Sequence, residues 1–348
     1  MKISLIHSAD EWRKSLGDFD TFESYHTWDF HQIELPGAGH RSLAIEVKSS
    51  GNALFIPFIE RLIPRTCLRD MTSVYGYPGP VFKGDLSQFP LLLASALDEL
   101  KRLGYVSVFS RCSSFSMEAT EDLPSGFQLA GRTVYIDLST PLSEQWNGYR
   151  GNLRRDINKA TETGVQCMRD GAEAVPAFLS LYHSTMDKVQ ASQNYYFDES
   201  YVLSLMGARD FDCRLYTCRY DGKIIAAALF MFCNDIVQYH LSGSDADYAK
   251  LGATKLLIDT VRRIATDEGR RYLNLGGGLG GQLDRLYEFK LGFSKSQNDF
   301  YLFKSVLNQD AYDDLCFAAG LGHDVSSNYF PKYRKPAANG DLEKNTAK

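Results

Sequence analysis

The sequence lacks the cysteine pattern of a zinc site or a disulfide frame. It holds 7 cysteines among 348 residues, an odd number, and no two of them have CxxC spacing. Cysteines arranged in this way are typical of reduced, buried thiols. We therefore expect no metal site in this protein.

Long apolar runs and a positive net charge are also missing. The longest apolar runs, near Leu91 and Ile224, reach about half of the roughly 18 residues that a membrane-spanning helix needs. The first residues carry charges, for example at Lys2 and Asp10, and no apolar segment of a secretory signal. A net charge of −5 gives no general attraction to nucleic acid. These absences predict a cytoplasmic protein without an integral membrane segment, whose contacts with polyanions come from local basic patches.

The length of the chain predicts more than one domain. At 348 residues it exceeds the roughly 250 to 300 residues at which a single core stops growing. With 44% hydrophobic and 23% charged residues, the composition is that of an ordinary globular protein. We place one domain at residues 1–140 and a second at 141–334, followed by a polar tail at 335–348 that is predicted to be disordered.

The second half has an informative order of predicted elements. A strand ends at the dipeptide Asp221-Gly222, which is typical of a tight hairpin turn, and an apolar strand over 224–232 follows it. A third strand spans 236–241, and apolar residues at 253, 257, 261 and 264 then repeat at helical spacing. A strand at 272–275, a glycine loop at 276–281, a helix to Leu291 and a strand near 300–303 complete the pattern. This order resembles that of GNAT-type acyltransferases.

The first half repeats much of this order. Strands are predicted at 42–47 and 53–61, a helix at 86–103, and a strand at 105–109 that follows Gly104. Gly269 likewise separates the later helix from its strand. We therefore predict an α/β (α+β) fold built from tandem duplicated GNAT-like domains, each a mixed, largely antiparallel sheet flanked by helices.

The densest basic patch is predicted on one helix, which spans 141–163. Two pairs at i,i+4 spacing, Arg150 with Arg154 and Arg155 with Lys159, flank its apolar stripe. Either this surface is a solvated face near a domain junction, or it contacts a substrate diphosphate or a tRNA backbone.

Four segments together resemble the Fem-type branch of the GNAT superfamily. They are GNLRRDINKA at 151–160, YHLS at 239–242, LYEFKLGF at 286–293 and YGYPGP at 75–80. The resemblance extends from about Ile3 to Tyr333. It implies two acyltransferase-like domains that share one substrate cleft and move an acyl or aminoacyl group onto an amine. Members that build peptidoglycan cross-bridges take this group from aminoacyl-tRNA, and others tied to surface polysaccharides use acyl-CoA.

The donor loop departs from the GNAT pattern. Ordinary GNAT enzymes hold the CoA pyrophosphate on a loop of pattern R/Q-x-x-G-x-G/A at a helix N-terminus. Here Tyr248 stands at the basic position and Leu251 at the first glycine, while Ala253 fits and Gly252 allows a shifted loop. We expect weak CoA binding or none at Gly252 and Ala253. The resemblance implies no tightly bound cofactor, and a donor that is either aminoacyl-tRNA or acyl-CoA.

The catalytic candidates are Lys290, His240 and Tyr239. Lys290 stands among apolar residues, which is a poor setting for a cation unless an anion is nearby, so we expect it to stabilise negative charge near the reacting carbonyl. The alternative is an ordinary solvated lysine. Strand alternation places His240 on the face opposite Tyr239 and Leu241, where it is either a general base or a core histidine.

The substrate-binding candidates come from three further patterns. Five glycines at 276–281 make either a tight turn or an anion-binding nest, and the tyrosines of the segment 75–80 make either a rigid turn or the wall of a saccharide pocket. With the basic helix, these patterns give Arg154, Arg155, Tyr75, Tyr77, Gly277, Gly278 and Phe289.

The function that follows is direct acyl or aminoacyl transfer onto an amine of a cell-envelope saccharide or peptide precursor. Such transfer needs positioning of donor and acceptor, a proton acceptor and donors to the developing oxyanion. Two alternatives remain open. One is an acyl-CoA-dependent N-acyltransferase of polysaccharide biosynthesis, and the other is a non-catalytic binding protein with a degenerate donor loop.

Overall fold

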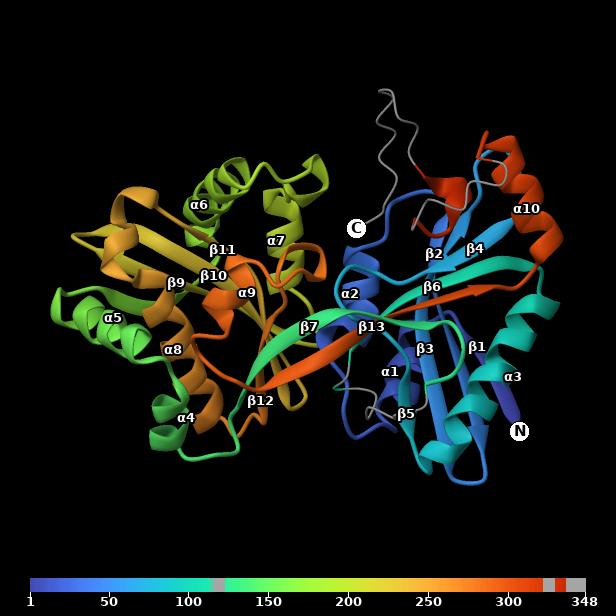
Figure 1. Cartoon of the computed structure of the whole chain (residues 1–348), viewed down its shortest axis with the longest axis horizontal. Coiled ribbons are helices and arrows are strands. Elements are labelled where there is room, and N and C mark those ends of the chain that lie inside the picture. The colour runs from blue at the N-terminus through green and yellow to red at the C-terminus, as the bar shows by residue number, and fades with distance from the viewer. Residues whose placement is uncertain (114, 116–122, 322–328, 336–348) are drawn as a thin grey trace. The chain divides into compact units, whose positions relative to one another are not determined.

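The structure is a computed structural model that describes residues 1–113, 115, 123–321 and 329–335. The predicted disordered tail lies outside the described residues from 336 onward. The chain forms two compact units, Met1–Ala130 with Phe300–Lys348 (unit 1) and Gly131–Asp299 (unit 2). Figure 1 shows the helices and strands of both units.

Unit 1 is a sheet in the order β1-β2-β3-β4-β6-β13 in which only β4 and β6 run parallel. The short β5 pairs with β3, and α3 packs on β2 and β3. The elements are β1 (Lys2–Ile6), α1 (Ala9–Leu16), α2 (Trp28–Ile33), β2 (His40–Ser49), β3 (Asn52–Leu62), β4 (Arg69–Thr72), β5 (Val81–Lys83), α3 (Phe89–Arg102), β6 (Tyr105–Ser113), the first part of β7 (Phe127–Asp137), most of β13 (Gln297–Val306) and α10 (Gln309–Ala318).

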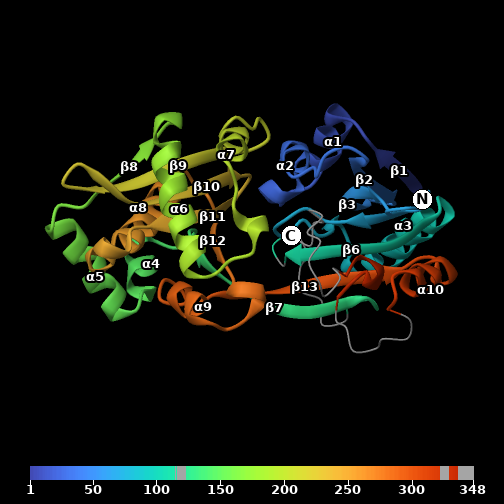
Figure 2. The same ribbon diagram turned by 90° about the horizontal axis from the view of Figure 1, so that it is seen from above.

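Unit 2 is a sheet in the order β8-β9-β10-β11-β12-β7 in which only β11 and β12 run parallel. Figure 2 shows α6 crossing over the strands of this sheet. The elements are α4 (Leu142–Gly148), α5 (Gly151–Glu162), β8 (Gln166–Asp170), α6 (Val175–Lys188), α7 (Glu199–Met206), β9 (Asp212–Tyr220), β10 (Lys223–Cys233), β11 (Ile236–Ser244), α8 (Ala253–Asp267), β12 (Tyr272–Gly276) and α9 (Arg285–Lys290).

The two sheets have the same strand order and the same strand directions, so the predicted duplication is confirmed. Only the last strand of each sheet comes from the other half of the sequence. β6 pairs with β13 near the C-terminal end, whereas β12 pairs with β7 from the first half. The units therefore differ from the predicted domains 1–140 and 141–334, since Phe300–Val306 belongs to unit 1. Phe303 is buried in the cluster beneath α3, which explains this placement.

The hairpin between β9 and β10 forms at the predicted dipeptide. Asp221 and Gly222 have φ values of 48° and 75°, the left-handed pair that a two-residue hairpin turn requires. β10 is apolar along its length because helices cover both of its faces, α6 on one and α8 on the other. The sequence pattern therefore predicted both the turn and the central position of this strand.

The predicted helix 141–163 is wrong as one element, because the chain breaks it into α4 and α5. Tyr149 and Arg150 are extended, with ψ values of 145° and 141°. The ring of Tyr149 is buried and its hydroxyl donates to Asp259, while the amide of Arg150 donates to Gly292 O at 2.9 Å. A continuous helix would direct that amide to its own preceding turn instead. Glycines at 148 and 151 weaken the helix on both sides of the break.

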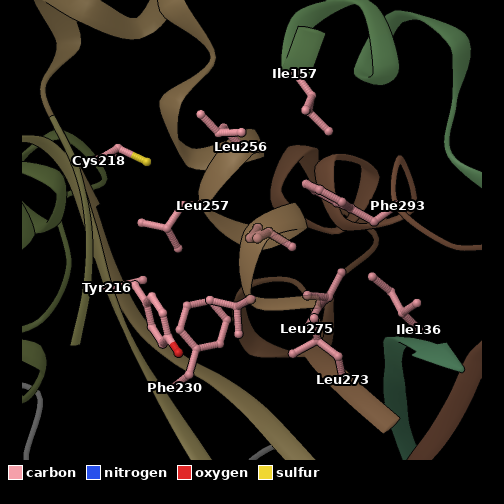
Figure 3. Close-up of a cluster of buried hydrophobic side chains, with 14 of the residues drawn as sticks. Ile136, Ile157, Tyr216, Cys218, Phe230, Leu256, Leu257, Leu273, Leu275 and Phe293 are labelled. Carbon is pink, nitrogen blue, oxygen red and sulfur yellow. The ribbon is translucent and has the colours of Figure 1, made fainter. Parts of the chain in front are cut away.

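The core of unit 2 lies between its sheet and the helices α5 and α8. Figure 3 shows Leu256 and Leu257 of α8 facing Tyr216 and Phe230 of the strands, with Ile157 of α5 above them. Within the described residues, no helix combines the length and apolarity needed to cross a membrane.

Candidate active site

The parallel strands β11 and β12 pair over only three residues in the middle of the unit 2 sheet, and then they part. They pair from Ile236 to Gln238 on β11 and from Tyr272 to Asn274 on β12, and no further. β11 continues along β10, whereas β12 continues along β7 to Gly276. Diverging strands of a mixed sheet are where binding sites commonly lie, so the surroundings of Gln238 and Asn274 are a candidate site in this sheet.

A β-bulge at His240 changes the predicted side-chain directions. Leu229 pairs with Leu241 and Phe230 pairs with Tyr239, which leaves His240 as the extra residue. Tyr239 and Leu241 therefore lie on opposite faces, and the prediction that they share a face is wrong. The ring of Tyr239 packs on Phe230 at 5.3 Å, and its hydroxyl donates to Ser242.

Tyr239 and His240 have different environments. Burial raises the pKa of Tyr239 to about 12, which keeps its hydroxyl protonated at neutral pH. The Nε2 atom of His240 lies 3.4 Å from the hydroxyl of Tyr201 on α7. His240 thus faces the α7 side of the sheet, whereas Tyr239 joins the core under α8.

Two buried polar residues mark the point where the strands part, and the sequence reasoning missed both. Gln238 is 2% exposed and Asn274 is 1% exposed. Their neighbours Val237, Leu273 and Leu275 belong to the core cluster, so alternation directs both polar side chains to the opposite face, toward α6 and α7. Among the described residues, the Gln238 amide nitrogen has no hydrogen-bond partner. The sequence signal that could have identified them was a polar residue in the middle of a strand whose other residues are mostly apolar and buried.

The glycine loop after β12 is a tight turn built around its own hydrogen bonds. The side-chain Oδ1 of Asn274 accepts from the backbone amide of Gly276, whose φ is 77°. A Cβ at Gly278 would collide with Gln282 O and with the carboxylate of Asp284. The loop therefore needs glycine at 276 for its conformation and at 278 for space.

Asp284 closes the loop onto the helix that follows it. As the N-cap of α9, its carboxylate accepts from the amide of Tyr287 at 2.9 Å and from that of Leu279 at 3.0 Å. These two bonds lower the pKa of the Asp284 carboxyl against the effect of burial. The sequence predicted this helix over 283–291, so Asp284 was placed inside the helix and its capping role was missed.

Lys290, in the last turn of α9, directs its side chain back into the glycine loop. The residue is 7% exposed, and its Nζ atom donates to Gly277 O at 2.6 Å. A Cβ at Gly276 would lie 3.3 Å from the same Nζ atom. Within the described residues, Gly277 O is the one hydrogen-bond acceptor of Lys290, and no carboxylate lies within ion-pair distance. The structure thus brings together Lys290 and Gly277 from the predicted set.

Burial lowers the pKa of Lys290 to about 8, and the Asp284 carboxylate opposes this effect. The ammonium form is therefore retained at neutral pH with only one of its three N–H groups bound. Such an incompletely paired, buried cation is suited to receive an anion.

The predicted donor segment Tyr248–Ala253 packs against the core, and the lysine that follows it is paired with an aspartate. It forms a 3-10 turn, Ala246–Leu251, which ends at Gly252 with φ 69° before α8 begins at Ala253. Tyr248 and Leu251 pack against the core cluster. Lys255, in the first turn of α8, forms an ion pair with Asp156 of α5, and a Cβ at Gly252 would lie 3.2 Å from Asp156 O.

The basic surface of α5 is smaller than predicted. Arg150 precedes the helix and forms an ion pair with Glu288 of α9 at 2.9 Å, so it does not extend the row of Arg154. Arg154 donates to Asn147 at 3.3 Å. Arg155 is exposed, and among the described residues it forms no ion pair.

The remaining predicted residues lie in packed positions. In unit 1, Tyr77 contacts the rings of Tyr25 and Phe300 at 6.2 and 5.2 Å, and a Cβ at Gly76 would collide with Tyr25. The segment of Tyr75 and Tyr77 is thus closely packed at Gly76 and Tyr77, and its role in substrate binding stays a prediction. Phe289 of unit 2 packs on Phe293 at 5.4 Å.

Comparisons with known proteins agree with this geometry. Residues 147–316 match the family described as Acetyltransferase (GNAT) domain. No curated protein sequence matches the chain. Among solved structures, FemX has a TM-score of 0.71 at 14% identity, with 90% of this chain and 99% of that chain covered.

Two further solved structures share the fold at lower similarity. A conserved protein of unknown function from Bacteroides thetaiotaomicron has a TM-score of 0.56 at 15% identity, covering 87% of this chain and 99% of that chain. The C-terminal domain of a putative lysylphosphatidylglycerol synthetase from Agrobacterium fabrum has a TM-score of 0.51 at 18% identity, covering 90% and 98%.

These findings confirm the predicted relationship and fold class. The domain match covers the parting strands, the glycine loop and Lys290, and the FemX likeness covers both units. Residues 147–316 thus match a GNAT acetyltransferase domain, and the chain shares its fold with FemX.

Proposed function

We propose that unit 2 transfers an acyl or aminoacyl group onto an amine by direct attack, with the reacting carbonyl held between the parting strands and the glycine loop. The observation that carries this proposal is Lys290, a buried cation with a single carbonyl partner at 2.6 Å. A structural lysine at such depth normally has a carboxylate partner. A charge left free in this way supports a substrate-binding or catalytic role.

Lys290 supplies the stabilisation that this reaction requires. The amine nitrogen attacks the donor carbonyl carbon, and the carbonyl oxygen gains negative charge until the bond to the leaving group breaks. One N–H of Lys290 is held by Gly277 O, and the other two remain to donate to this oxygen. The bond to Gly277 fixes the position of the ammonium before the substrate arrives, so the cation needs no reorganisation during the reaction.

For the donor we favour an aminoacyl ester of the tRNA type over acyl-CoA. The Asp156 carboxylate is paired with the ammonium of Lys255 in the first turn of α8, so this cation is already neutralised where a GNAT enzyme would bind the CoA pyrophosphate. Leu251 and the packed ring of Tyr248 leave the backbone less accessible there. Calorimetry with acetyl-CoA distinguishes the donors: a micromolar Kd that Gly252→Pro abolishes would favour acyl-CoA as the donor.

For the acceptor we propose an amine on a cell-envelope saccharide or peptide precursor, in the cytoplasm. The likeness to FemX and to the C-terminal domain of a putative lysylphosphatidylglycerol synthetase supports this choice. Arg154 and Arg155 are the proposed contacts for the phosphates that such precursors carry.

The central test is Lys290→Met, which keeps the apolar stem and removes the charge. Loss of one such contact to a developing oxyanion typically lowers kcat by roughly 100- to 1000-fold. The transfer rate and the melting temperature should be measured together, with Lys295→Met as the matched control on an exposed lysine nearby in the sequence. A stable Lys290→Met protein that keeps transfer within about threefold of wild type contradicts the proposed role.

A further inference from the structure

Two cysteines of unit 2 lie directly opposite each other on neighbouring strands. Cys167 of the edge strand β8 pairs with Cys218 of β9 in the antiparallel register. Opposite residues in such a ladder have Cα atoms about 4.5 to 5.5 Å apart, within the range of about 4.4 to 6.8 Å that a disulfide spans. Both side chains contact the same core cluster, so the two thiols share one face of the sheet.

The two thiols differ in accessibility. Cys218 is fully buried, and Figure 3 shows its sulfur directed into the cluster on the side of α8. Cys167 is only half-buried at the edge of the sheet. A reagent from solution therefore reaches Cys167 before it reaches Cys218.

The surroundings of Cys167 favour its thiolate form. The neighbouring Cys218 side chain lowers the pKa of Cys167 against the effect of burial, and the hydroxyl of Thr260 and the guanidinium of Arg263 act in the same direction. The neighbouring Cys167, together with burial, raises the pKa of Cys218. A partly accessible thiol with a lowered pKa beside a second thiol with a raised pKa is the arrangement of a redox-reactive cysteine with its resolving partner.

We propose that Cys167 and Cys218 are a redox-modification site that reacts with low-molecular-weight disulfides. The Cys167 thiolate attacks one sulfur of the disulfide, forms a mixed disulfide and releases one thiolate. The Cys218 thiol then loses its proton and attacks the Cys167 sulfur, which releases the second small thiol. In total, two protein thiols are oxidised to one disulfide, and one small disulfide is reduced to two thiols.

Closing this disulfide changes a bond at the start of α8. The Cys218 thiol donates to the carbonyl oxygen of Ala253 at 3.3 Å, and Ala253 is the first residue of that helix. A disulfide sulfur has no proton to donate, so oxidation removes this bond. The redox state of the pair is thereby coupled to the segment Tyr248–Ala253, whether or not that segment binds an acyl donor.

The test treats the full-length chain with oxidised glutathione and follows the products by intact mass and by peptide mapping without reduction. Cys67 is exposed and would add its own adduct, so all proteins carry Cys67→Ser. The expected product has two fewer titratable thiols, no retained glutathione and a peptide joining Cys167 to Cys218. A retained adduct on Cys167 with Cys218 still free overturns the resolving role, and an unmodified Cys167 overturns the site.

Two variants assign the order of the steps. Cys218→Ala keeps an apolar side chain in the core and removes the resolving thiol, so one glutathione should stay attached to Cys167. Cys167→Ala should leave Cys218 unmodified, because that thiol is fully buried. A glutathione adduct on Cys218 in this second variant, in a protein with the wild-type melting temperature, contradicts the proposed order.

Discussion

The two units share one strand order, but a buried charged residue in each of them has different partners. In unit 1 the carboxylate of Asp70 is fully buried and accepts from Arg61, Arg334 and Tyr333, so its negative charge is fully paired within the protein. In unit 2 the ammonium of Lys290 is buried with one neutral carbonyl partner. The first arrangement ties the C-terminal segment to the sheet, whereas the second leaves a charge for a ligand. Unit 2 also holds a paired buried cluster at Asp259 and Arg262, so Lys290 stands apart from both networks, as the proposed role of unit 2 in the reaction requires.

A second network in unit 1 supports this contrast. Glu60 is fully buried and forms ion pairs with Arg41 and Arg69, both at 2.7 Å, and it also accepts from the hydroxyl of Tyr105. The hydrogen bond from Arg41 lowers the pKa of the Glu60 carboxyl against burial. Polar groups that are satisfied within the protein in this way have little left to offer a substrate.

The largest effect is expected from breaking the matched network. Asp70→Asn keeps the shape of the side chain but leaves the buried guanidinium groups of Arg61 and Arg334 without their counter-ion. Removing one partner of a buried ion pair costs about 3 to 5 kcal/mol of the free energy of unfolding. Urea denaturation measures this cost, with Asp20→Asn, at an exposed surface pair, as the control. A loss below about 1 kcal/mol would show that the network is not structural.

The pH dependence of Lys290 sharpens the same comparison. Burial lowers the pKa of Lys290 to about 8 from the ordinary 10.5. Between these two values the unfolded chain binds a proton that the folded chain does not, so the free energy of unfolding rises with pH across this window. Relative to Lys290→Met, the free energy of unfolding of the wild type should increase by up to about 3 kcal/mol between pH 8 and 10.5. Its transfer rate should fall over the same range as the cation is lost. If the difference in the free energy of unfolding between the wild type and Lys290→Met does not change with pH, Lys290 is not a buried cation with a lowered pKa.

Much of this architecture follows from local sequence patterns. The left-handed turn at Asp221-Gly222 and the apolar run of β10 are short-range signals, and they predicted a hairpin in the centre of a sheet. The unusual setting of Lys290 was also predicted from the sequence, because its neighbours in the chain are apolar and apolar surroundings disfavour a cation. These features depend on a few consecutive residues, which is why one sequence was enough.

Other features depend on partners far away in the chain. The bulge at His240 comes from its pairing with β10, and alternation along β11 gives no sign of it. The pairing of β7 with β12 and of β13 with β6 depends on which sheet edge each strand meets, and each pair is far apart in the sequence. The break at Tyr149 and Arg150 is fixed by contacts with Asp259 and Gly292. Long-range pairing of this kind was outside the reach of the sequence analysis.

Gln238 offers a smaller effect at the point where β11 and β12 part. Its amide nitrogen is buried without a partner among the described residues, which costs stability unless a ligand accepts from it. Gln238→Leu should leave the melting temperature unchanged or raise it, while transfer falls about tenfold, equivalent to ~1.4 kcal/mol for one lost hydrogen bond. Unchanged transfer in a stable variant would give Gln238 no role in the reaction.

The smallest effect is expected at the basic surface of α5. Arg154 is partly exposed and Arg155 is exposed on α5, and charge contacts near the surface are worth about 1 kcal/mol or less because solvent screens them. If they hold substrate phosphates, replacing both with glutamine removes binding that the ground state and the transition state share. KM should therefore rise about fivefold while kcat changes little, and the salt dependence of kcat/KM should flatten. Lys101→Gln, on an exposed position of α3 in unit 1, is the matched control. An unchanged KM in the double variant would return these arginines to the role of a solvated helix face, and phosphate recognition would then have to come from the glycine loop beside Lys290.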